Sequence, residues 1–415
     1  MADGPRPLRV RRLGENRRGE IRLTRFLRHE AVHPAVMLAQ TAAGTAERCR
    51  DRRVLVIQDT TVLQSSGGGG TYLHCSLALD GESGALLGLV DAQFLERHAG
   101  EREQRRGRGI EDKQSFRWLE GVEQAASVCA GARQITCVAD RESDIYESFA
   151  LRTSETDLLV RACHDRSLED GPRLFAHLSA QPVAAQATLD LPGRPGRAAR
   201  TARLSVRFAR LSLARPRHGQ RQDLPASVTV QAVELREEDP PAGSDPVHWR
   251  LLTTHPVRDA AEALAVAELY RERWAIEQFF RTLKTQGFDV ENVRIADPGA
   301  RRRLIMAAVV AAVCVQQLVQ ARDGGERGLR PITDAFAPED QPLLEACCMQ
   351  LEGQTDRQKN PHPRGSLAYA AWVCARLGGW TGYYGKPGPV VMLEGWKEFQ
   401  ARKRGAALRD APHDV

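Results

Sequence analysis

The chain has 415 residues, 42% of them hydrophobic, and a net charge of +6 in which arginine supplies 53 of the 59 basic side chains. This composition is ordinary for a soluble globular protein with two or three domains, and the longest apolar run (304–315) is too short to span a bilayer. Arginine suits phosphate-bearing partners because its planar fork binds two phosphate oxygens at once. A GC-rich genome gives the same bias, so the charge permits a nucleic-acid partner without establishing one.

The nine cysteines show neither a CxxC pair nor the spacing of a metal finger. Several lie inside apolar runs, as Cys137 does in "QITCVAD". We therefore expect reduced, buried cysteines of a cytosolic protein.

The first half of the chain alternates helix-like and strand-like patterns. Residues 1–50 are basic, and their second half has a helical pattern. Five strands are then predicted, with a glycine-rich turn at 67–70, a basic loop at 98–114 and a helix around 115–130 between them. These strands carry the sequences "RRVLVIQDTTVLQ", "YLHCSLALD", "GALLGLVDAQFLER", "QITCVAD" and "TDLLVRA".

The second half begins with a change in the pattern of apolar and polar residues. Polar alternation and Pro/Gly-rich turns between 165 and 246 predict a β-rich insertion of antiparallel strands. "VHWRLLTTHPV" returns to a strand pattern. It is followed by one long helix at about 258–285, a second helix at about 301–322 and a helical remainder at 323–415.

Three acidic residues stand out by position. Asp59 and Asp140 each end a predicted buried strand, and Glu277 lies on the polar face of the long helix. Acids at the C-terminal edge of a sheet face a ligand in many α/β proteins. Three converging carboxylates need cations, and hard divalent ions such as Mg²⁺ or Mn²⁺ suit oxygen ligands. The alternative is that each aspartate only starts a turn or caps a helix.

The long helix carries an unusual polar face. At about 100° per residue, the side chains of Tyr270, Arg273, Glu277 and Lys284 leave one narrow face of a single helix. Lys284 is one of only six lysines. The alternative is a solvated face with i,i+4 pairs, in which Lys284 forms a surface salt bridge with Glu277 or Asp289.

These motifs together resemble a known family. "DTT" after one strand, "DRESDIYE" after another and the spacing Y-x₂-R-x₃-E-x₆-K on a helix are similar to the bacterial DDE transposases of the insertion-sequence four group, including its Tn-five-like members. The last pattern is the YREK signature of that group. "VHWRLLTT" and "SLAYAAWVCARLGGW" extend the resemblance over roughly residues 20 to 405.

The resemblance implies an α/β fold with a ribonuclease H-like catalytic core, built as a mixed five-stranded sheet with helices, interrupted by the insertion and followed by a helical C-terminal domain. Asp59, Asp140 and Glu277 become the catalytic, metal-binding triad for two Mg²⁺ or Mn²⁺ ions. The implied domains are a shortened helical DNA-binding region (1–50), a catalytic domain (51–164 and 247–322), the β-strand insertion (165–246) and a C-terminal dimerisation domain (323–415).

The resemblance also implies contacts to double-stranded DNA, both transposon ends and target. A lysine can serve as a point charge on a phosphate where a broad guanidinium does not fit equally well. Two tryptophans are implied to hold a base flipped out of the duplex; their alternative is packing in a strand core or against a helix. The expected DNA-binding residues are Tyr270, Arg273, Lys284, Trp249, Trp274, Arg161 and Arg281, the last of which has a solvated arginine as its alternative.

The implied activity is cut-and-paste transposition by a homodimer in the bacterial cytoplasm, associated with the nucleoid. Only about fifty residues precede the first catalytic strand, whereas relatives carry a longer helical DNA-binding domain there. Two other classes therefore stay open: a shortened, regulatory protein that binds full-length transposase, or an inactive fragment of an element. A metal-dependent nuclease without strand transfer is a further alternative.

Overall fold

The structure is a computed structural model of the chain. It describes residues 8–64, 71–96, 115–191, 193, 198–216 and 223–410. The expected glycine-rich turn at 67–70 and basic loop at 98–114 lie outside these residues.

The strands follow the predicted order, with one addition. In chain order they are β1 (Arg53–Leu63), β2 (Thr71–Asp80), β3 (Leu86–Glu96), β4 (Gln134–Ala139), β5 (Thr156–Arg161), β6 (Ala185–Leu191), β7 (Arg200–Ala214), β8 (Ser227–Glu237) and β9 (His248–Thr253). Strand β6 lies inside the predicted β-rich insertion but was not predicted individually.

The helices cluster at the two ends of the chain and between the strands. The α-helices are α1 (Val10–Leu13), α2 (Arg17–Arg28), α3 (Pro34–Cys49), α4 (Phe116–Val128), α5 (Tyr146–Ala150), α6 (Leu174–Ser179), α7 (Ala260–Arg271), α8 (Trp274–Lys284), α9 (Pro298–Ala321), α10 (Gly325–Gly328), α11 (Gln341–Leu351), α12 (Leu367–Leu377) and α13 (Pro389–Asp410). Five short 3₁₀ helices are η1 (Arg141–Ser143), η2 (Val290–Asn292), η3 (Ile332–Asp334), η4 (Pro338–Asp340) and η5 (Asp356–Gln358).

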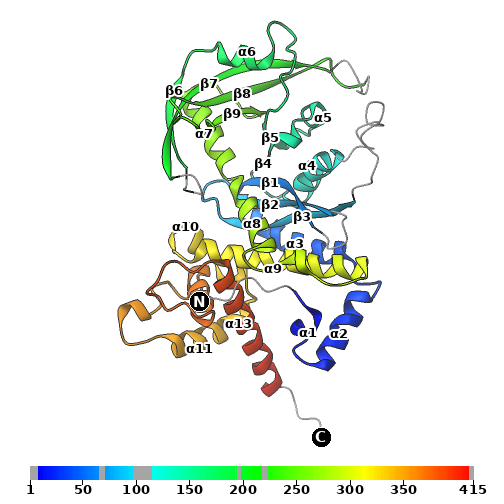
Figure 1. Cartoon of the computed structure of the whole chain (residues 1–415), viewed down its shortest axis with the longest axis vertical. Helices are drawn as coiled ribbons and strands as arrows, with labels where there is room; N and C mark the ends of the chain where they lie inside the picture. Colours follow the sequence, from blue (N-terminus) through cyan, green and yellow to red (C-terminus); the bar gives the residue numbers. More distant parts are fainter. Residues whose placement is uncertain are drawn as a thin grey trace.

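All nine described strands form one mixed sheet in the order β3-β2-β1-β4-β5-β9-β8-β7-β6. The pairs β1/β4 and β4/β5 are parallel, and the others are antiparallel. The five strands predicted for the core are all present, but they are part of a larger sheet than expected. Because β9 pairs with β5 on one side and β8 on the other, the insertion strands extend the core sheet. Figure 1 shows them at the top of the elongated molecule.

Strand β1 is buried on both faces, which explains its unbroken apolar run. Leu55 and Ile57 belong to a core that includes residues of α8 and α9, whereas Val54 and Val56 belong to a second core with residues of α4 and α5. The part of the sheet around β1 therefore lies between two helical layers.

Helix α9 separates the sheet from the C-terminal helices (Figure 1). It contacts β3 and α3 on one side and α12 and α13 on the other. By length and composition its 24 residues could cross a membrane, but 67% of its most apolar window is buried within the protein. Its apolar character is therefore that of a core helix, as the sequence predicts for 304–315.

The prediction of a single helix at 258–285 is wrong. Helix α7 ends at Arg271 and α8 begins at Trp274. The backbone N–H groups of Arg273, Ala275 and Ile276 each bond to the carbonyl three residues earlier. The break is thus a short 3₁₀-like tightening, of the kind that occurs within helices at functional positions. Neither Gly nor Pro marks it in the sequence.

Candidate active site

The register of β1 and β4 brings Asp59 and Asp140 side by side. The last parallel pair is Ile57 with Val138. Each aspartate comes two residues later, on neighbouring segments of the same chain. Asp140 follows the end of β4 and accepts a hydrogen bond from the Glu142 N–H at 3.0 Å, so it also caps η1. The expectation that Asp59 ends its strand is wrong, because β1 continues to Leu63.

The strand continues past Asp59 because β2, which pairs with β1 from Val54 onward, still pairs with it beyond the last residue paired with β4. Asp59 pairs with Cys75 of β2, and this antiparallel pairing runs on to Leu63 and Thr71. Asp59 therefore lies where β1 loses its parallel neighbour, and its side chain is 19% exposed.

Asp59 is in a strongly acidic environment. Burial and the negative charge of Asp140 raise the pKa of Asp59 to about 6, against the lowering effects of the Thr60 N–H and the Arg273 charge. Glu277 also raises the pKa of Asp59. The two other acids predicted from sequence thus both act electrostatically on Asp59.

Arg273 joins two of these acids. Its Nη2 donates to Oε1 of Glu277 at 2.6 Å, and its Nη1 lies 3.4 Å from Oδ2 of Asp59. The guanidinium is only 12% exposed. Because it lies between the two carboxylates, their oxygens are turned toward a protein cation.

A different group has closer ligand atoms. Among the described residues, Asp144, Cys163 and His164 place three such atoms within 4.8 Å of one another. The carboxylate of Asp144 is fully buried, however, and it already accepts bonds from Arg166 and from the N–H groups of Cys163 and His164. This arrangement closes a loop and leaves no free carboxylate oxygen for a cation. Cys163 itself is exposed, which corrects the expectation of uniformly buried cysteines; Cys314 is partly buried.

The four residues of the predicted polar helix face are buried to different degrees. Tyr270 is 3% exposed. The side chains of Arg273, Glu277 and Lys284 are 12%, 29% and 25% exposed. The face is therefore partly buried, and it contains one i,i+4 pair of the kind that the alternative expected, Arg273 with Glu277.

Tyr270 packs against the insertion side of the sheet. Its ring meets Trp249 edge to face, with centroids 5.3 Å apart. Burial raises the pKa of Tyr270, while the charges of Arg273 and Arg161 oppose that effect. Arg161 also donates to the His248 carbonyl at 2.9 Å. The structure thus gathers Arg161, Trp249 and Tyr270 beside Arg273.

Trp274 and Arg281 lie on the outer side of α8. Trp274 is 40% exposed and lines a cavity of about 760 Å³ between α8, α9 and α10. The Arg273 guanidinium lies 5.9 Å from its ring centroid. Arg281 is exposed. Neither residue packs in the core of the helical layer.

Lys284 ties the end of α8 to the end of β1. Its Nζ donates to the Val62 carbonyl at 2.8 Å and lies 3.1 Å from Oε1 of Glu291. The partner predicted for a salt bridge was Glu277 or Asp289, and Glu291 takes that place instead. No sequence pattern predicted this pair, because it depends on the path of the chain between α8 and η2.

Arg117, in the first turn of α4, also lies at this site and was not predicted. This arginine contacts residues next to both aspartates, donating to Thr60 at 3.0 Å and to Glu142 at 2.6 Å. Its only sequence signal is a basic residue before the buried Trp118, which is not specific.

The chain is an α/β protein with a mixed sheet and helices on both of its faces. Its polar site lies beyond the last parallel pair of β1 and β4. Comparison with known families gives the class: the family described as "Transposase DDE domain" matches residues 82–314, more than half of the chain. The chain therefore belongs to the DDE transposase family. Asp140 and Glu277 lie inside the matched residues, and Asp59 precedes them.

Proposed function

We propose that the chain is a cut-and-paste DNA transposase of the insertion-sequence four group, in which Asp59, Asp140 and Glu277 bind two divalent cations, Mg²⁺ or Mn²⁺. The observation that carries the proposal is the register of β1 and β4, which sets the two aspartates side by side with Glu277 linked to Asp59 through Arg273. The mixed sheet with helices on both faces is consistent with a ribonuclease H-like core.

The donor set fits hard cations. Three carboxylates supply only oxygen ligands, which Mg²⁺ and Mn²⁺ prefer. Burial and Asp140 raise the pKa of Asp59 to about 6, although the Thr60 N–H and Arg273 oppose this effect. The nearby protein groups therefore do not fully stabilise the negative charge of the Asp59 carboxylate. A cation between the carboxylates supplies the missing compensation.

The proposed reaction is phosphoryl transfer at a transposon end. When bound, two divalent ions stabilise the attacking and leaving oxygens of an in-line displacement. Water attacks first and nicks the end; the freed 3′-OH then attacks the opposite strand to form a hairpin. A second water then attacks the hairpin phosphodiester and releases the 3′-OH, which attacks a phosphodiester of target DNA and displaces a target 3′-oxygen. Each step exchanges one phosphodiester oxygen for another and needs no external energy source.

The residues around the acids are suited to hold the DNA end. Tyr270, Arg161 and Arg273 gather on one side of the carboxylates, and Lys284 lies at the other end of α8, beside β1. We propose that these side chains form a YREK-type site that contacts phosphates of the DNA end, with Arg281 as a further contact. Trp249 and Trp274 offer aromatic faces for an unstacked base.

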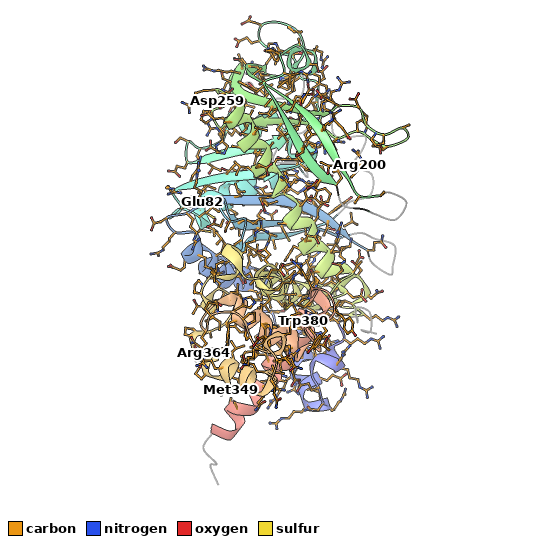
Figure 2. The ribbon with its side chains drawn as sticks, turned by 90° about the vertical axis from the view of Figure 1, so that its left-hand side faces the viewer. Glu82, Arg200, Asp259, Met349, Arg364 and Trp380 are labelled. Carbon is orange, nitrogen blue, oxygen red and sulfur yellow. The ribbon has the colours of Figure 1, made fainter. Side chains whose placement is uncertain are left out.

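We propose that the protein acts as a homodimer through residues 323–410 and works on DNA at the bacterial nucleoid. Helices α11–α13 lie at the end of the molecule opposite to the insertion strands. Figure 2 shows Met349 and Arg364 on that end, far from Asp259. Met349, an apolar side chain at this end, is 69% exposed.

Nicking of a plasmid that carries the DNA flanking the gene tests the proposal. We expect Mg²⁺-dependent nicking by the wild type and its loss in Asp59→Asn, Asp140→Asn and Glu277→Gln. Glu82→Gln is the matched control, since Glu82 lies on the β2–β3 turn and pairs with Arg133 at the surface (Figure 2). Wild-type nicking by a folded triad variant would remove that residue from the site.

A further inference from the structure

Arg117 connects the two chain segments that carry the aspartates. Its Nε donates to Oγ1 of Thr60, the residue after Asp59, at 3.0 Å. Its Nη2 donates to Oε2 of Glu142, two residues after Asp140, at 2.6 Å. The Arg117 side chain is only 10% exposed. A single rigid guanidinium therefore spans the gap between β1 and η1.

The link continues below Arg117 into the core. A guanidinium only donates, so the Thr60 hydroxyl oxygen accepts from Arg117. The same hydroxyl forms a second hydrogen bond with Nδ1 of His74, 2.9 Å away. Burial and the Arg117 charge lower the pKa of His74 to about 3, which keeps the ring neutral at physiological pH. The ring is fixed edge to face against Trp118, with centroids 4.7 Å apart.

Arg117 and Arg273 treat the acids differently. Arg273 bonds to triad oxygens themselves. Among the described residues, Arg117 donates to Thr60 and Glu142 and leaves the oxygens of Asp59 and Asp140 to other partners. Arg117 can therefore keep its bonds while a cation occupies the triad. A group that holds the neighbours of metal ligands, and not the ligands, sets their spacing.

We propose that Arg117 is a positioning residue that fixes the distance between Asp59 and Asp140 by bonding Thr60 to Glu142, with neutral His74 orienting the Thr60 hydroxyl. The proposal rests on the proposed metal site. It adds a residue of α4 to a site otherwise built from β1, β4 and α8. Its consequence is that Arg117 controls cation affinity without touching cation or DNA.

Direct binding of Mn²⁺, followed by the loss of the free-ion electron paramagnetic resonance signal, tests the proposal without any need for activity. For Arg117→Gln we expect affinity to fall by about ten-fold or more, the usual effect of removing a group that orients metal ligands. Arg117→Lys restores part of the affinity, since one bond of the two can re-form. Arg133→Gln is the matched control, because this arginine pairs with Glu82 at the surface.

Variants at the hydrogen-bond partners of Arg117 test whether Arg117 acts on cation affinity through Thr60 and Glu142. Glu142→Ala should weaken Mn²⁺ binding, and adding it to Arg117→Gln should cost little more, because both changes break the same link. Thermal melting checks that each variant is folded. If Arg117→Gln does not fold, Glu142→Ala and Thr60→Val carry the test, and wild-type affinity in both overturns the proposal.

Asp140→Asn distinguishes the two levels of inference. Loss of Mn²⁺ binding in Asp140→Asn together with wild-type binding in folded Arg117→Gln overturns the role of Arg117 and leaves the metal site standing. Unchanged binding in Asp140→Asn overturns the metal site, and the role of Arg117 with it. Loss in both, with unchanged Arg133→Gln, is the expected result.

Discussion

Arg273 donates to Glu277 across one turn of helix, with Nη2 and Oε1 2.6 Å apart. The same guanidinium reaches Asp59 at 3.4 Å. Arg273 is thus a counter-ion for two of the three carboxylates that we propose as metal ligands. It is also a proposed contact for DNA phosphate, and one guanidinium cannot serve both partners fully. Cation binding and DNA binding are therefore expected to support each other: a phosphate that draws Arg273 away frees oxygens for the cations.

Arg273→Gln should tighten Mn²⁺ binding to the DNA-free protein by at least about ten-fold, since a competing unit charge within about 4 Å is worth a few kcal/mol at a partly buried site and ~1.4 kcal/mol is a factor of ten. The same variant should bind DNA more weakly. Arg281→Gln is the control, because Arg281 lies exposed on the same helix and should leave Mn²⁺ affinity unchanged. Weaker Mn²⁺ binding in Arg273→Gln would show that the guanidinium organises the carboxylates and does not compete for them.

The stability of the protein without divalent cations should depend on pH through Asp59. Its pKa in the folded chain is about 6, above the ordinary value of 3.8, because of burial and the charge of Asp140. The folded chain thus holds this proton more tightly than the unfolded chain. Ionising Asp59 therefore destabilises the fold, fully above about pH 6 and not at all below about pH 4.

Asp59→Asn removes that cost. We expect the variant to be more stable than the wild type at pH 8 by up to about 3 kcal/mol, at ~1.4 kcal/mol per pKa unit. The difference should shrink as the pH falls from 6 toward 4. Thermal melting in a chelator across this range measures it, with Glu82→Gln as the surface control. A stability difference that is constant with pH would mean that Asp59 is not the titrating group.

Patterns along the sequence were sufficient to predict the core strands and to place Asp59 and Asp140 near the ends of two of them. The apolar run of β1 is continuous because both faces of the strand are buried. Burial selects an apolar side chain at each position, so the sequence alone indicates a buried strand. The spacing of Tyr270, Arg273 and Glu277 places them together even though the helix breaks at Arg273, because a short 3₁₀ turn changes their directions only slightly.

Features that depend on distant pairing were not predictable. Nothing in β9 indicates that it pairs with β5 and β8 at once, so the five-stranded sheet expected from the sequence did not include the insertion strands. The partner of Lys284 follows from a chain reversal before η2. Arg117 is one of many arginines, and only the fold shows that it lies between Thr60 and Glu142.

The close packing of α12 and α13 should be sensitive to a single methyl group. A Cβ added at Gly395 would lie 1.7 Å from the Cys374 carbonyl oxygen, a backbone atom that cannot turn away. Gly395→Ala should therefore push the helices apart and lower stability by about 1–3 kcal/mol or more. Gly405→Ala is the matched control on the same helix, where nothing lies within 4 Å.

The control should gain stability by up to about 1 kcal/mol, the helix preference of Ala over Gly. Chemical denaturation of both variants gives the comparison. Equal effects of the two substitutions would contradict the packing of these helices. If residues 323–410 form the dimer interface, light scattering of folded Gly395→Ala should also show a weaker dimer at the same protein concentration, whereas Gly405→Ala should not.

Lys284 provides the sharpest test of the DNA interface. Its Nζ binds the Val62 carbonyl and Glu291, so two roles are open to it: holding β1 against α8, or presenting a charge to phosphate beside Asp59. If it neutralises a phosphate, Lys284→Ala should weaken binding to an end-sequence duplex and reduce the salt slope of log K by about 0.9, the loss of one counterion-releasing contact. Lys284→Arg should restore the slope, because the charge returns.

Glu291→Gln separates these roles, because it removes the partner of the ion pair and keeps the lysine charge. As a partly exposed pair, Lys284 and Glu291 should contribute less than about 1 kcal/mol to stability. We therefore expect Glu291→Gln to melt slightly earlier than the wild type and to bind DNA with an unchanged salt slope. The measurement is a salt titration of the wild type and the three variants against one duplex. Identical slopes for all four proteins would leave Lys284 as a tether between α8 and β1 and reject its contact with phosphate.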